Sequence, residues 1–139
     1  MTAVLTIHSC LAEIARASDW MADGTGPLEL DSSIRLAMRL CLEEALANVV
    51  THAASDEAIT LSLSIDQNTV HLGIEDSGPA FDPTVAPAPA VNDGIEAATI
   101  GGRGLTLIRG FADRLDYRRQ DGRNRFIMTF NRDRSAPDR

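Results

Sequence analysis

The chain has 139 residues, of which 44% are hydrophobic and 24% are charged, and its formal net charge is -7. These totals indicate one globular domain with a single core rather than a disordered segment. The acidic balance argues against direct binding to nucleic acid, because proteins with that function present a basic face.

The positive charge comes entirely from arginine, since the sequence contains no lysine. A P-loop and a eukaryotic-type protein kinase each need a phosphate-binding lysine, so both are excluded if the protein uses ATP. No stretch approaches the roughly 20 apolar residues of a membrane span, and the N-terminus lacks the pattern of a signal peptide. We therefore expect a cytoplasmic protein that does not enter a membrane.

The first part of the chain predicts one strand followed by two helices. Residues 3–7 have the composition of a short strand, and Ser9 can cap the helix that follows. After a loop that contains glycine and proline, Asp31 or Ser32 caps a long second helix, which runs to about Ala54.

The hydrophobic period then changes from 3.6 residues to 2. Apolar and polar residues alternate over residues 59–66, and after a short turn the alternation resumes with Val70, Leu72 and Ile74. One further step places Asp76 on the same face as these apolar residues. An acidic side chain is thus predicted to point toward the layer of helices.

Residues 77–100 show no regular pattern, and a loop of this length inside a compact domain is usually functional. A glycine cluster at residues 101–104 opens a third helix, and two strands, residues 114–119 and 124–131, follow it. Strands paired as hairpins with helices between them favour an α+β fold, a two-layer α/β sandwich. The buried stripe of the third helix is predicted to contain Leu105, Ile108, Phe111 and Ala112.

Two polar residues of the second helix could carry chemistry. Glu44 and Asn48 are four positions apart and therefore lie on one helix face. A carboxamide oxygen suits Mg²⁺, which takes one or two protein ligands and leaves its other positions to water and phosphate. A carboxylate one turn away could orient or deprotonate an attacking hydroxyl. The simpler alternative is that both side chains are merely exposed.

Two later segments, IEDSGPAF at residues 74–81 and GGRGLTLI at residues 101–108, could bind a nucleotide. Asp76 could accept a hydrogen bond from the exocyclic amine of adenine, and Gly78 would let a flat base approach the backbone. The glycine-rich segment would present backbone amides and a helix N-terminus to an anion such as phosphate. The alternatives are an ordinary turn and an ordinary junction between a loop and a helix.

The order of these segments resembles the motif set of the GHKL ATPases, which is E-x-x-x-N on a helix, then D-x-G-x-x-F, then G-G-x-G-L. Within that superfamily of histidine kinase-like ATPase domains, the chain is similar to the anti-sigma-factor serine/threonine kinases over essentially its whole length. EEALANVVTHA, EDSGPAFDP and GGRGLTLIRGFADRLDYRRQDGRNRF carry this resemblance. It implies the Bergerat fold, in which a mixed sheet has helices on one face and ATP lies between the helices and a lid.

The resemblance also implies roles for individual residues. Glu44 would be the catalytic group that deprotonates or orients a serine hydroxyl, and Asn48 would bind Mg²⁺ together with the triphosphate. Asp76 would bind the adenine amine, and residues 79–100 would form the ATP lid. For His52, a helix cap or a lid contact is favoured over direct contact with phosphate. The other nucleotide-binding positions that the resemblance implies are Gly78, Phe81, Gly101, Gly102, Arg103, Gly104, Leu105 and Thr106.

Members of this family bind a sigma factor, phosphorylate an anti-anti-sigma protein of the STAS type, and often form homodimers. The resemblance therefore implies ATP and Mg²⁺ as cofactors and these two kinds of protein as partners, with no direct contact to nucleic acid or membrane. We expect a single domain over residues 1–139, with a frayed tail at residues 133–139.

Three departures from the family pattern bear on function. Ala80 stands where many members have a second glycine, and Asn124 and Arg125 stand where many have Gly-Thr near the adenine. The lid contains no lysine or arginine, which leaves Arg103 as the nearest candidate to meet the γ-phosphate. An ATP-binding module that sequesters a partner without phosphoryl transfer therefore stays open. A histidine-kinase catalytic domain is a third reading, but we expect no helical hairpin that carries a phospho-accepting histidine.

Overall fold

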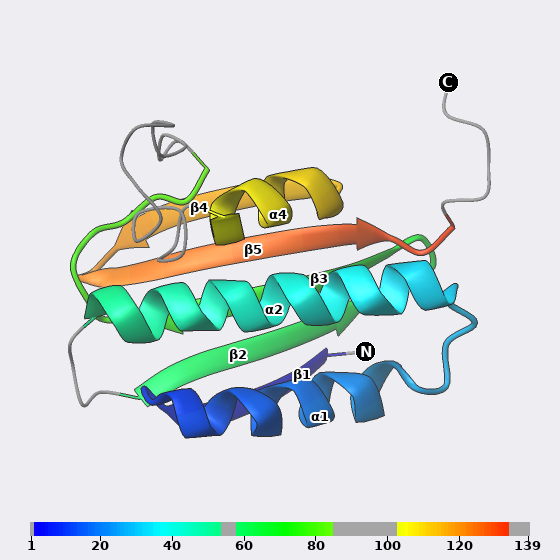
Figure 1. Ribbon diagram of the computed structural model, residues 1–139, viewed down its shortest axis with the longest axis horizontal. Helices are drawn as coiled ribbons and strands as arrows, with labels where there is room; N and C mark the ends of the chain where they lie inside the picture. The colour runs from blue at the N-terminus through cyan, green and yellow to red at the C-terminus, as the bar shows by residue number, and fades with distance from the viewer. Residues whose placement is uncertain (1, 54–57, 85–102, 134–139) are drawn as a thin grey trace.

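Five strands in the described part of the chain, residues 2–53, 58–84 and 103–133, form one sheet in the computed structural model (Figure 1). The helices lie together on one face of this sheet, which gives two layers. In chain order the elements are β1 (Thr2–His8), the short 3-10 helix η1 (Leu11–Glu13), α1 (Ile14–Thr25), α2 (Ser32–Ala53), β2 (Ala58–Ile65), β3 (Thr69–Asp76), α4 (Arg103–Phe111), β4 (Arg114–Gln120) and β5 (Arg123–Asn131). The predicted α+β class and two-layer architecture are confirmed.

The strand directions differ from the expected mixed sheet. The strands follow the order β1-β2-β3-β5-β4, and all four neighbouring pairs in the described residues are antiparallel. The connections explain this, because β2–β3 and β4–β5 are hairpins, which can only be antiparallel. Between β1 and β2 the chain passes over the sheet twice, in the oppositely directed helices α1 and α2 (Figure 1). Strand β2 therefore runs antiparallel to β1.

The core lies between the inward face of the sheet and helices α1, α2 and α4. The alternation along β3 is confirmed, since Val70, Leu72 and Ile74 are each almost fully buried and Asp76 follows them on the same face. The same period operates in β5, where Phe126, Met128 and Phe130 are buried. The largest fully buried side chains of α2 are Ile34, Met38, Leu42 and Leu46.

Two features of the helix starts can be compared with the prediction. The amides of Ile34 and Arg35 donate to the carbonyl of Asp31, so the long helix begins where the sequence places it. The prediction for Ser9 is wrong, because the first helical turn begins after Cys10 without a side-chain cap. The Ser9 hydroxyl is instead buried and has no hydrogen-bond partner among the described residues.

The third helix, α4, buries only part of the stripe that the sequence predicts. Ile108 is fully buried and Ala112 packs partly against the core, as predicted. Phe111 is 43% exposed, which contradicts the predicted stripe. It is the last residue of α4, where the helix no longer covers the core.

The final hairpin turns at Asp121 and Gly122, which have φ angles of 53° and 74°. Two successive residues with positive φ are typical of a type I′ turn, and this type matches the twist of the strands it joins. The turn pairs Gln120 with Arg123 and so fixes the register of β4 against β5. Among the described helices, none has both the length and the apolar composition needed to cross a membrane.

Candidate functional site

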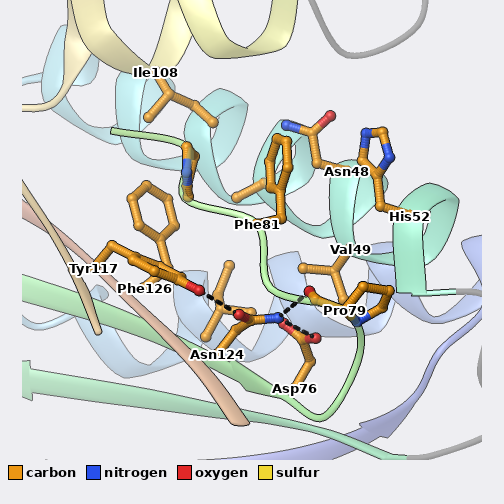
Figure 2. Close-up of a pocket in the computed structure, with 13 residues that line it drawn as sticks. Asn48, Val49, His52, Asp76, Pro79, Phe81, Ile108, Tyr117, Asn124 and Phe126 are labelled. Carbon is orange, nitrogen blue, oxygen red and sulfur yellow. Dashed lines mark hydrogen bonds between the residues drawn. The ribbon is translucent and has the colours of Figure 1, made fainter. Parts of the chain in front are cut away.

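A pocket opens between α2, α4, the end of β3, the middle of β4 and the start of β5 (Figure 2). Its cavity volume is about 40 Å³, and it opens to solvent at its mouth. Most of its wall is apolar, with a few polar side chains that converge from separate elements, as in many sites for small molecules. The lining residues are Ala45, Asn48, Val49, His52, Ile74, Asp76, Pro79, Phe81, Pro83, Ile108, Tyr117, Asn124 and Phe126.

Asn48 is the polar residue that α2 contributes to this wall. It is only 7% exposed, and its carboxamide makes no hydrogen bond with any residue that the structure describes. The residue lines the pocket and its amide is not fully enclosed, so this group can bind a ligand that enters there. The alternative that Asn48 is a plain surface residue is therefore wrong.

Glu44 lies one helical turn before Asn48 and is half-buried, but it is not part of the pocket wall. Its neighbour Glu43 accepts a hydrogen bond from the hydroxyl of Ser18 at 2.9 Å, which ties α2 to α1. Of the two adjacent acids, Glu43 is thus engaged in helix packing, and Glu44 makes no ion pair or hydrogen bond with the described residues.

Asp76 ends β3 on the inward face and is 8% exposed. Its Oδ1 atom accepts hydrogen bonds from the backbone amide of Gly78 at 2.8 Å and from Nδ2 of Asn124 at 3.1 Å. Within the described residues, Oδ2 accepts none. The carboxylate is thus held through one oxygen and keeps the other for a donor on a ligand.

The resemblance places Asn124 near the adenine, whereas Tyr117 and Arg119, which bond to it, were not identified as site residues from the sequence. Asn124 is 6% exposed, and its side chain contacts Asp76, Tyr117 and Arg119. The sequence also contained a signal that Asn124 points inward, because the alternation of buried residues in β5 continues back from Phe126 to position 124. The pairing of this position with Asp76 was not available, because β3 and β5 are far apart in sequence.

The first residues of the predicted lid are attached to two helices. The imidazole of His52 stacks on the ring of Phe81, and Arg109 Nη2 of α4 donates to the carbonyl of Pro83 at 3.1 Å. His52 therefore makes the lid contact that the sequence favoured. Residues 79–84 are the described part of the segment predicted to form the lid, and residues 85–102 lie outside the described residues. The lid itself stays a prediction.

The glycine cluster is only partly covered by the structure. Gly101 and Gly102 lie outside the described residues, as does the predicted tail apart from Asp133. The first turn of α4 is formed by Arg103, Gly104, Leu105 and Thr106. This helix packs against α2, so its N-terminal turn belongs to the same layer as Asn48.

Comparisons with known proteins agree with this geometry. The family model described as the histidine kinase-like ATPase domain matches residues 7–130. The serine/threonine-protein kinase BtrW of Bordetella bronchiseptica is 40% identical over 108 residues, which cover 76% of this chain and 74% of that protein. The family match begins at the end of β1 and covers all the pocket residues and nearly all of the final hairpin, and the chain therefore belongs to the histidine kinase-like ATPase domain family.

Proposed function

We propose that the protein is an ATP-dependent serine kinase and anti-sigma factor, which phosphorylates a STAS-type anti-anti-sigma protein and sequesters a sigma factor. The observation that carries the proposal is the meeting of Asn48 and Asp76 in one pocket. They come from different elements, and each presents a polar atom that no described residue satisfies. The name of the relative, a serine/threonine-protein kinase, supports the reaction class.

The adenine base would occupy the pocket between the apolar residues of α2 and the sheet. Val49, Ile74 and Phe126 provide flat and aliphatic surface there. The free Oδ2 atom of Asp76 would accept a hydrogen bond from the exocyclic amine of the base. Apolar walls with one oriented acceptor are a common way to bind and recognise a purine.

The triphosphate would extend toward the start of α4, where residues 103–106 form the first turn of the helix. Amides at a helix N-terminus attract phosphate through unsatisfied N–H groups and the helix dipole. Asn48 would hold Mg²⁺ through its carboxamide oxygen, and its lack of another partner fits this role. The bound ion would neutralise charge on the phosphates.

Glu44 would act on the serine hydroxyl of the protein substrate. Its carboxylate would accept the hydroxyl proton as the serine oxygen forms a bond to the γ-phosphorus, and the bond between that phosphorus and the bridging oxygen breaks to release ADP. Positioning of the two substrates would supply most of the remaining rate enhancement. The half-buried position of Glu44, one turn from Asn48, supports this assignment.

The proposal is tested by incubating the protein with γ-labelled ATP and a candidate STAS-type protein. We expect acid-stable label on the partner, and we expect Glu44→Gln to remove transfer while ATP affinity is kept. Glu43→Gln is the matched control, because Glu43 faces Ser18 of α1 and should keep transfer. Acid-labile label would instead point to a histidine kinase.

A second function, an ATP-binding module that sequesters its partner without phosphoryl transfer, is favoured by one observation. The lid, residues 79–100, has no lysine or arginine to meet the γ-phosphate. ATP binding without label on any partner, together with ATP-dependent capture of a sigma factor, would establish this module and contradict the kinase.

A cytoplasmic location and a homodimer stay predictions.

A further inference from the structure

Asn124 is the centre of a hydrogen-bond network at the inner end of the pocket (Figure 2). It faces Asp76 across the pairing of β3 with β5, and it faces Arg119 across the pairing of β5 with β4. Its Nδ2 donates to Asp76 Oδ1 at 3.1 Å and to the carbonyl of Pro79 at 2.8 Å. Its Oδ1 accepts from the Tyr117 hydroxyl at 2.5 Å and from Arg119 Nη1 at 3.2 Å. Both ends of the amide are therefore occupied.

The orientation of this amide follows from the chemistry of its neighbours. A guanidinium can only donate, so Oδ1 of Asn124 must face Arg119. The atoms on the opposite side, Asp76 Oδ1 and the carbonyl of Pro79, are both acceptors and must face Nδ2. A rotated amide would place like groups against each other on both sides, so one orientation is selected.

Arg119 connects the same network to the root of the lid. Its Nη1 atom donates to the carbonyl of Gly78 at 2.6 Å in addition to Asn124. Arg118 and Arg119 are both exposed, but they point to opposite faces of the sheet, as strand alternation requires. Of these two adjacent arginines, only Arg119 belongs to the pocket network.

The network determines which part of Asp76 a ligand can use. Oδ1 is occupied by Gly78 and Asn124, and Oδ2 receives no hydrogen bond from the described residues. Without Asn124, Oδ1 would keep one hydrogen bond, from the amide of Gly78, and the last torsion of the side chain, which is broad for aspartate, would be restrained at one point rather than two. A carboxylate with more freedom about this torsion would present a less well fixed acceptor to the pocket.

We propose that Asn124 is a positioning residue for nucleotide selection, which fixes Asp76 so that its free oxygen reads the donor on the base. This inference rests on the proposed binding of ATP. At position 6, adenine carries a donor amine, guanine and hypoxanthine carry an acceptor oxygen, and unsubstituted purine carries only hydrogen. Asn124 thus acts on the discrimination between bases rather than on affinity in general.

The test compares calorimetric Kd values for ATP and for purine riboside triphosphate, which lacks the exocyclic amine. The wild-type chain should prefer ATP by about tenfold or more, because the amine bonds a charged acceptor. Asn124→Ala should bring this preference to within about twofold while affinity for purine riboside triphosphate is kept. Arg119→Ala should reduce the preference, and Arg118→Ala should leave it unchanged.

Asn124→Asp provides a second variant of the same shape in case the alanine variant does not fold. It keeps an acceptor for Tyr117 and Arg119 but replaces the donor that faces Asp76, so the preference for ATP should again be lost. Thermal unfolding of each variant checks that the chain is folded.

Equal weakening of both ligands in the Asn124 variants, or an unchanged preference, would show a purely structural role and overturn the inference. A wild-type chain that binds neither nucleotide would overturn the proposed function itself. A wild-type chain that binds both nucleotides equally would retain nucleotide binding but refute selection through Asp76.

Discussion

The imidazole of His52 and the ring of Phe81 are stacked, with ring centroids 4.9 Å apart and ring planes 20° from parallel. His52 belongs to the last turn of α2, and Phe81 belongs to the segment that follows β3. Both rings line the pocket. The stack therefore joins the helix that carries Asn48 to the first residues of the proposed lid.

Loss of this stack should loosen the start of the lid. Aromatic pairs contribute about 0.5–1.5 kcal/mol beyond their buried area, so His52→Ala should raise hydrogen exchange at residues 80–84 by roughly two- to tenfold. His52→Phe should retain protection because it keeps a ring at this position. Exchange measured by mass spectrometry checks both variants, with the exposed neighbour substitution Thr51→Ala as the control. Equal exchange in the Thr51 and His52 variants would show that the stack does not restrain the lid.

Replacement of Asn48 should separate ligand binding from stability. Asn48→Ala should remove most of the Mg²⁺-dependent part of ATP affinity, about tenfold or more, because a hydrogen-bonding or coordinating group to a charged ligand is lost. Asn48→Asp supplies an oxygen ligand again and should keep the dependence on Mg²⁺. Calorimetric titration of ATP with Mg²⁺ and with a chelator measures the effect.

The melting temperature of the Asn48→Ala variant provides the control. Because the buried amide has no partner among the described residues, its removal should leave the melting temperature unchanged or raise it. A large drop in melting temperature would mean that Asn48 has a structural role instead.

Two helical glycines should respond in opposite directions to substitution by alanine. A Cβ atom at Gly24, near the end of α1, would lie 2.6 Å from Cδ2 of Leu63, which is fully buried. Overpacking costs about 1–3 kcal/mol and exceeds the gain of roughly 1 kcal/mol in helix propensity, so Gly24→Ala should destabilise the fold. At Gly110, near the end of α4, nothing lies within 4 Å of such an atom. Gly110→Ala should therefore stabilise the fold by up to about 1 kcal/mol, as urea denaturation can measure.

Asp66 should make the free energy of unfolding depend on pH in the acid range, through the turn between β2 and β3. The Thr69 hydroxyl, the amide of Asn68 and the amide of Thr69 donate to this carboxylate and hold its pKa well below the ordinary value of 3.8. The folded state therefore favours the charged form. This stabilisation is complete above about pH 4 and is lost as the pH falls toward the lowered pKa of the folded state.

The corresponding measurement is the free energy of unfolding as a function of pH. Asp66→Asn should be less stable than the wild type near neutral pH, and the difference should shrink below about pH 4. Gln67→Ala, in the same turn, should leave the acid slope unchanged. A constant difference between wild type and Asp66→Asn across the acid range would contradict this account.

The sequence predicted the elements well because local periodicity specifies them. Alternation in β3 placed Asp76 on the inward face, and the two strands predicted over residues 114–119 and 124–131 form the final hairpin. Predictions that depended on more than local pattern were less successful. Ser9 does not cap a helix, and Phe111 is exposed although the helical period placed it in the buried stripe. Both positions lie at helix ends, where tertiary packing decides which residues are covered.

The sequence by itself determined the fold class and brought forward Glu44, Asn48 and Asp76, because each lies in a motif whose spacing is local. The tertiary structure alone decided that Asn124 holds Asp76 and that Arg119 holds the carbonyl of Gly78. The physical reason is the strand order, since β5 inserts between β3 and β4 and joins residues more than 40 positions apart. Hydrogen bonds between such strands depend on register and side-chain direction across the sheet, which no local pattern in the sequence encodes.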